Sequence, residues 1–103
     1  MNNTPTLLIF YNRPDKTRLL LTELEKIKPK KLYIFCDGPK NNEDLKKIKV
    51  IKKLIQSITW TTPTLRFENE NLGCKKGVSS AITWFFSNEK AGVILEDDCL
   101  PNE

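Results

Sequence analysis

Residues 92–101, with the sequence GVILEDDCLP, define the last element of the expected fold and its most charged end. The stretch begins as a β-branched apolar run, which predicts a buried strand, and it ends in Glu96, Asp97 and Asp98 before a proline stops it. Three adjacent carboxylates repel one another, and burying them without partners would be costly. The pattern therefore indicates either a cleft in which a divalent cation or hydrogen-bond donors balance the charge, or a solvated acidic turn.

Length and composition limit the classes of protein to consider. A chain of 103 residues with 39% hydrophobic and 29% charged residues is typical of one globular domain. The net charge of +4 comes from lysines, many of them in residues 40–53, where they also fit a solvated helix face. Nucleic-acid binding is disfavoured, because no basic strand with interleaved aromatic residues accompanies the charge.

Neither the membrane nor the secretory class is indicated. No run of about 18 apolar residues is present, so no membrane span is predicted. Residues 1–5 lack the basic and apolar regions of a secretory signal. Three cysteines without any histidine disfavour zinc sites and paired disulfides, so we expect reduced thiols and a cytoplasmic location. The lack of histidine also excludes a histidine-based catalytic triad.

Apolar strand-length runs alternate with helical periodicity along the whole chain. The expected strands are residues 6–11, 32–36 and 64–67, the third being more polar and nearer a sheet edge, and the run that leads into the acids. Between them, Pro14, Asn42 and Asn71 are placed to begin three helices. The apolar faces of these helices are expected to be Leu20, Leu24 and Ile27; Ile48, Ile51, Ile55 and Ile58; and Val78, Ala81, Ile82 and Phe85. We also assign Trp84 to the core.

The expected fold is α/β, a βαβαβαβ three-layer sandwich with a mainly parallel four-stranded sheet. In such sheets ligands bind beyond the carboxyl ends of the strands, where the strand order reverses. The loops at those ends carry most of the chain's candidate polar residues, namely Asn12, Arg13, Asp37, Asn71, Gly73, Lys75, Asp97 and Asp98. We therefore expect a ligand site along that edge.

Four ordered strings, LIFYNRPDKT, LYIFCDGPK, NLGCKKGVSSAITWFF and GVILEDDCLP, resemble the nucleotide-binding half of GT-A-fold glycosyltransferases. The likeness is to bacterial sugar transferases related to the N-acetylglucosaminyltransferase I type, and it spans nearly the whole chain. It implies metal-dependent transfer of a sugar from a nucleoside diphosphate sugar, UDP-linked by expectation, to a glycan or other hydroxyl acceptor.

The resemblance also implies roles for individual residues. Asp98, as the last acid of the DxD-type motif, would ligate Mn²⁺ or Mg²⁺, which both favour oxygen ligands. Asp97 would face the ribose or metal-bound water, and Glu96 the donor sugar, although Glu96 fits a strand-end ion pair equally well. Asp37 would contact the base, with a turn-forming role before Gly38 as the alternative.

The remaining nucleotide-binding candidates each have a structural alternative. Arg13 would approach the phosphates or remain on the surface, and Asn12 would touch the ribose or cap a helix. Gly73 would let backbone approach the ligand or relieve a turn. Lys75 lies in a first helical turn where a cation could face an anion, but a solvated lysine pair with Lys76 is the simpler interpretation.

No general base is identified, because the resembled family supplies the base and the acceptor surface after the DxD strand. The resemblance thus implies a single nucleotide-sugar-binding domain over residues 1–103, ended before the acceptor-binding part. We expect it to bind donor without robust catalysis, and to self-associate through an open sheet edge. Two alternatives compete with this interpretation: a non-catalytic, Mg²⁺-binding receiver-like or regulatory α/β module, and a nucleotidyltransferase of similar architecture. The second lacks support, because no glycine-rich signature follows the first strand of this chain.

Overall fold

Seven elements alternate along the chain in a computed structural model that describes residues 3–96. They are β1 (Thr6–Phe10), α1 (Pro14–Ile27), β2 (Leu32–Cys36), α2 (Asn42–Gln56), β3 (Thr64–Phe67), α3 (Cys74–Phe86) and β4 (Val93–Glu96). This order confirms the expected βαβαβαβ arrangement. None of the helices in the described part of the chain is long and apolar enough to cross a bilayer.

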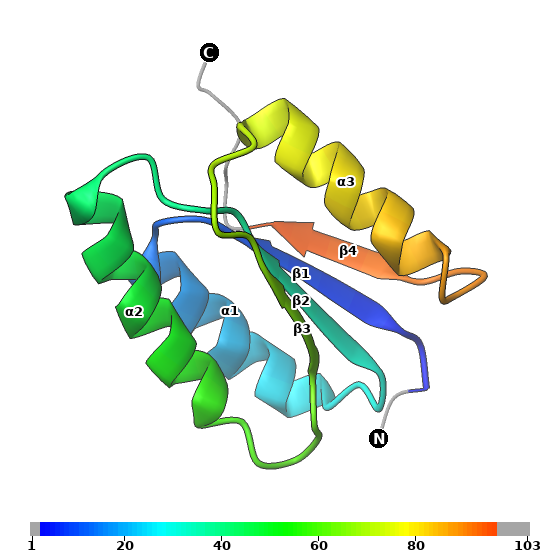
Figure 1. Ribbon diagram of the computed structural model, residues 1–103. Helices are drawn as coiled ribbons and strands as arrows, with labels where there is room; N and C mark the ends of the chain where they lie inside the picture. Colours follow the sequence, from blue (N-terminus) through cyan, green and yellow to red (C-terminus); the bar gives the residue numbers. More distant parts are fainter. Residues whose placement is uncertain (1–2, 97–103) are drawn as a thin grey trace.

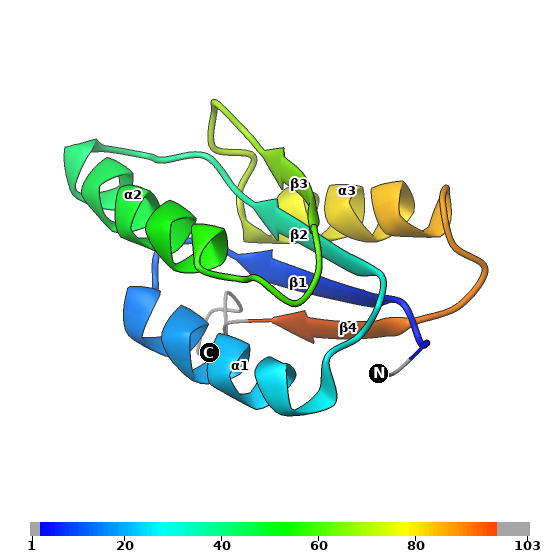
Figure 2. The same cartoon turned by 90° about the horizontal axis from the view of Figure 1, so that it is seen from below.

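The four strands form one parallel sheet in the order β3-β2-β1-β4 (Figure 2). β3 lies at one edge, as its polar composition predicted, and β4 at the other. The chain moves outward from β1 to β3 and then returns to the far side of β1. Because βαβ crossovers are right-handed, this reversal puts α3 on the opposite face of the sheet from α1 and α2 (Figure 1).

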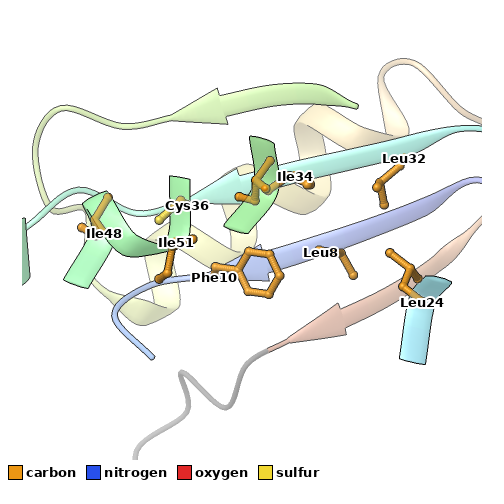
Figure 3. Packing of buried hydrophobic residues seen from close by; sticks show 9 residues of the cluster. Leu8, Phe10, Leu24, Leu32, Ile34, Cys36, Ile48 and Ile51 are labelled. Carbon is orange, nitrogen blue, oxygen red and sulfur yellow. The ribbon is translucent and has the colours of Figure 1, made fainter. Parts of the chain in front are cut away.

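Each face of the sheet has its own hydrophobic core. The larger core lies under α1 and α2, and its buried residues are Leu8, Phe10, Leu24, Leu32, Ile34, Cys36, Ile48, Ile51 and Ile55 (Figure 3). The smaller core lies under α3 and consists of Leu7, Ile9, Phe35, Ala81 and Phe85. All five residues of β1 are buried, as expected for a strand covered on both faces. The three-layer α/β prediction is therefore confirmed.

Two predicted helix caps and one apolar position are wrong. The side chain of Asn41, not Asn42, caps α2 by accepting a hydrogen bond from the Asp44 amide at 2.9 Å. Gly73 occupies the N-cap of α3, because the Asn71 amide instead donates to the carbonyl oxygen of Gly38 at 2.9 Å. Ile27 is 52% exposed, since it lies about 60° around the helix from the buried Leu24, at the margin of the apolar stripe.

Candidate functional site

The carboxyl ends of the strands meet at one edge of the sheet, where the strand order reverses between β1 and β4. Phe10 pairs with Cys36 across β1 and β2, and Ile9 pairs with Glu96 across β1 and β4. Residues that follow β1 and β2 therefore lie at the same edge as Glu96. Side chains alternate along a strand, and Ile94 packs into the α3-side core, so Glu96 also lies on the α3 face. Asp97 and Asp98 lie outside the described residues.

Asp37 directly follows β2 and is 7% exposed. Its Oδ1 accepts hydrogen bonds from the amides of Gly38 and Leu72, both at 2.8 Å. Its Oδ2 accepts from the Gly73 amide at 3.1 Å and the Asn71 side chain at 3.3 Å. A carboxylate offers about four lone-pair sites, so these four donors fill its acceptor capacity. Asp37 thus holds the loop that leads into α3, and its direct contact with a base stays a prediction.

Gly38 completes this junction between the β2 end and the loop before α3. A Cβ atom at Gly38 would overlap the backbone carbonyl carbon and oxygen of Glu70. Only a residue without a side chain allows the two backbones to approach this closely. The Asp37-Gly38 pair is therefore more than a local turn, because it fixes where α3 begins relative to the sheet.

A second buried carboxylate, Asp44, joins the loops after β1 and β2. It is 5% exposed and accepts hydrogen bonds from the Tyr11 hydroxyl at 2.5 Å and the Asn12 side chain at 2.8 Å. It also accepts one from the Lys40 amide at 3.0 Å. The side-chain amide of Asn12 is therefore engaged within the protein, and its contact with a ribose stays a prediction.

Hydrogen bonding sets the ionisation of this network. Burial alone would raise the pKa of Asp44, but hydrogen bonds from Tyr11, Asn12 and the Lys40 amide, with the Lys40 charge, hold that pKa below its ordinary value. Burial, followed by the hydrogen bond to Asp44, raises the pKa of Tyr11 well above its ordinary value. Both effects favour an ionised Asp44 facing a neutral Tyr11 at pH 7, which keeps the two loops bridged.

A cavity of about 230 Å³ lies between this edge of the sheet and the start of α3. Its lining is apolar toward the sheet and helix and polar at the loops, and consists of Ile9, Phe10, Tyr11, Phe35, Asp37, Lys40, Asn71, Cys74, Gly77 and Val78. The volume is smaller than the roughly 300 Å³ at which pockets for drug-sized ligands begin. A cavity of this size has room for a small ring but not for a whole nucleotide sugar.

Sequence reasoning missed Tyr11, Lys40, Cys74 and Gly77 as lining residues. A weak signal was present, because all four lie inside the strings that carry the family resemblance. Tyr11 had been assigned to the first strand, and Lys40 to a general lysine-rich surface. Their place in the site depends on Asp44, which sequence analysis had not connected to either residue.

Two of the predicted cationic positions lie away from the cavity. Arg13 is exposed at the N-cap of α1 and does not line it. Lys75 is exposed in the first turn of α3, beside a shallow hollow lined by Leu72, Gly73, Cys74, Lys75, Lys76 and Ser79. Gly73 adopts a φ of 91°, a conformation that favours glycine, so its structural role at the helix start is clear.

No cluster of three or more His, Cys, Asp or Glu side chains that could hold a metal ion occurs within residues 3–96. Of the three acids at positions 96–98, Glu96 lies within the described residues. It brings one carboxylate to the place where the strand order reverses, between β1 and β4. A metal site here would therefore depend on Asp97 and Asp98.

Comparison of the chain with protein-family models, with curated proteins and with solved structures finds no match.

Proposed function

We propose that this protein binds a nucleoside diphosphate sugar, expected to be UDP-linked, at the carboxyl edge of its sheet and belongs to a glycosyltransferase of the GT-A type. The observation that carries the proposal is the cavity at the carboxyl ends of β1 and β2, next to the reversal of strand order between β1 and β4, with Glu96 paired to Ile9 across that reversal. Crevices at such reversals are where open α/β sheets bind ligands.

In this proposal the base of the ligand binds in the cavity, and the rest of the ligand lies along the carboxyl edge of the sheet. The ring of the base enters the cavity, against the apolar side chains of Ile9, Phe35 and Val78. The ribose and diphosphate extend out of the cavity along the carboxyl edge of the sheet, the edge that also carries Glu96 through its register with Ile9. The hydrogen bonds of Asp37 and Asp44 hold the loops beside the cavity in place before the ligand binds. Binding then costs less conformational entropy, because these loops are already ordered.

The proposal includes a divalent metal ion, bound by acids at positions 96–98, at the end of β4. Asp98 would hold Mn²⁺ or Mg²⁺, with Asp97 toward the ribose and Glu96 toward the sugar. A bound divalent ion supplies charge neutralisation for a departing diphosphate. The chain's own residues in the described range bind and orient the donor, and none of them is assigned as the base that deprotonates an acceptor hydroxyl. A cytoplasmic location is part of the same proposal.

Titration calorimetry with UDP and Mn²⁺ tests this function. We expect metal-dependent UDP binding by the wild-type chain and its loss in Asp98→Ala, because removal of a direct ligand weakens metal binding. Unchanged binding in Asp98→Ala would remove that residue from the site, and a chain that binds no UDP would refute the proposed function. Incubation with acetyl phosphate and Mg²⁺ separates a receiver-like module, which would acquire a labile phosphate.

A further inference from the structure

The charges around the cavity are unevenly available to a ligand. Asp37 is its only acidic lining residue in the described part of the chain, and the four donors described above occupy its carboxylate. Lys40 is the only lining residue there with a positive charge, and it is exposed. Its ammonium forms no ion pair with a carboxylate of residues 3–96. Among the described residues, the cavity therefore presents one charged side chain that is neither saturated with hydrogen bonds nor in an ion pair, and its charge is positive.

The backbone of Lys40 is held by a hydrogen bond, and its side chain contacts an aromatic ring. Its amide donates to Asp44 Oδ2 at 3.0 Å, and the same oxygen accepts the Tyr11 hydroxyl. Its Nζ lies 5.9 Å from the centroid of the Tyr11 ring, within the range of a cation–π contact. One buried carboxylate thus holds the Tyr11 ring and the backbone of Lys40 beside the cavity, and the ring in turn contacts the ammonium.

We propose that Lys40 is the residue that recognises a phosphate of the bound ligand, in the position that sequence analysis gave to Arg13 or Lys75. This inference rests on the proposed function, since it assumes a ring in the cavity with a phosphate attached. The ammonium of Lys40 contacts the phosphate oxygens, because within residues 3–96 Lys40 is the one cationic side chain that lines the cavity. Asp44 acts as a positioning residue, through Tyr11 and the Lys40 amide.

Ligands of graded charge test the assignment. Uridine, UMP and UDP are titrated into the wild type, Lys40→Gln and the matched controls Arg13→Gln and Lys75→Gln, in excess Mn²⁺ at fixed ionic strength. In Lys40→Gln we expect UMP and UDP affinity to fall about ten- to a hundredfold, the range for a lost hydrogen bond to a charged group. Uridine affinity should stay within about twofold. Lys40→Arg should retain most of the binding, and each control should stay within about threefold.

The possible outcomes distinguish a failure of the Lys40 assignment from a failure of the proposed function. If the wild type binds neither UMP nor UDP, the proposed function and the role of Lys40 both fall. If the wild type binds UDP but Lys40→Gln binds it equally well, only the role of Lys40 falls. An equal loss for all three ligands would mean that Lys40 contacts the ring, which also overturns the phosphate assignment. Lys40 is exposed, so its replacement should leave the thermal midpoint unchanged.

Discussion

Replacing Asp37 with asparagine distinguishes two roles for its carboxylate: holding the loop before α3, or contacting a bound base. The substitution keeps the shape of the side chain but turns one oxygen into an NH₂ group. If Oδ2 is replaced, the new donor faces the Gly73 amide and the Asn71 side chain, which are donors themselves. If the amide is flipped, it faces the amides of Gly38 and Leu72 instead. Either orientation leaves backbone donors near the buried residue 37 without an acceptor.

The loss can be estimated from these contacts. Hydrogen bonds to a charged group contribute about 1.5–3 kcal/mol each, and an unsatisfied buried donor costs about 1–3 kcal/mol. Because Asn71 keeps its contact with the Gly38 carbonyl, we expect a net destabilisation of about 2–4 kcal/mol. With a urea m-value of about 1.5 kcal/mol per M, the unfolding midpoint should fall by about 1.3–2.7 M.

Urea denaturation followed by circular dichroism measures this shift, with Glu70→Gln as the control. Glu70 is exposed in the same loop, so its substitution should change the free energy of unfolding by less than about 0.5 kcal/mol. A midpoint for Asp37→Asn as close to the wild type as that of the control would refute the structural role. It would instead favour direct recognition of a base by Asp37.

Three further predictions follow from the packing. Gly38→Ala should lower stability by about 1–3 kcal/mol, because its Cβ would overlap the backbone of Glu70; an unchanged thermal midpoint would contradict this. The hydrogen bond to Glu89, with burial, raises the pKa of Tyr33 to about 12, and the pKa of Tyr11 is raised as well. Absorbance at 295 nm should therefore show little tyrosinate near pH 10 in the native chain, and about half ionisation of both residues at that pH in guanidinium, where each has its ordinary pKa of about 10; an equal tyrosinate signal in the native chain would be contrary. Val93 is 45% exposed on the edge strand β4, so sedimentation should show concentration-dependent association that Val93→Lys abolishes, and a monomeric wild type would exclude it.

Stability should also depend on pH through Asp44. Its pKa is depressed in the folded chain, so the stability it contributes is present above the pKa of the unfolded carboxyl and is lost as the pH falls through the folded value. Denaturation midpoints measured from pH 7 downward should decline less steeply in Asp44→Asn than in the wild type. Parallel curves for the two proteins would show that another carboxylate carries this dependence.

The elements of the fold could be predicted because their signals are local. β1 is a continuous apolar run, and α2 repeats isoleucines at helical spacing at positions 48, 51 and 55, all of which are buried. Parallel pairing followed from the helices between strands, and it brought Glu96 to the edge that carries Asp37. The N-caps of α2 and α3 were wrongly predicted at Asn42 and Asn71, because nearby residues compete for the cap position and contacts outside the helix, such as that of Asn71 with Gly38, help to decide between them.

Local periodicity in the sequence is thus enough to specify the succession of strands and helices along the chain. With parallel pairing, it also specifies the edge of the sheet at which the polar loops gather. It does not specify which polar atoms meet there. Asp44 joins Tyr11 and Asn12 across 33 and 32 residues, and Asp37 joins Leu72 and Gly73 across 35 and 36 residues. Those partners are brought together by the packing of two helix layers on the sheet, which no local pattern encodes. For that reason the cavity and Lys40 emerged from the three-dimensional arrangement, while the fold class was visible in the chain.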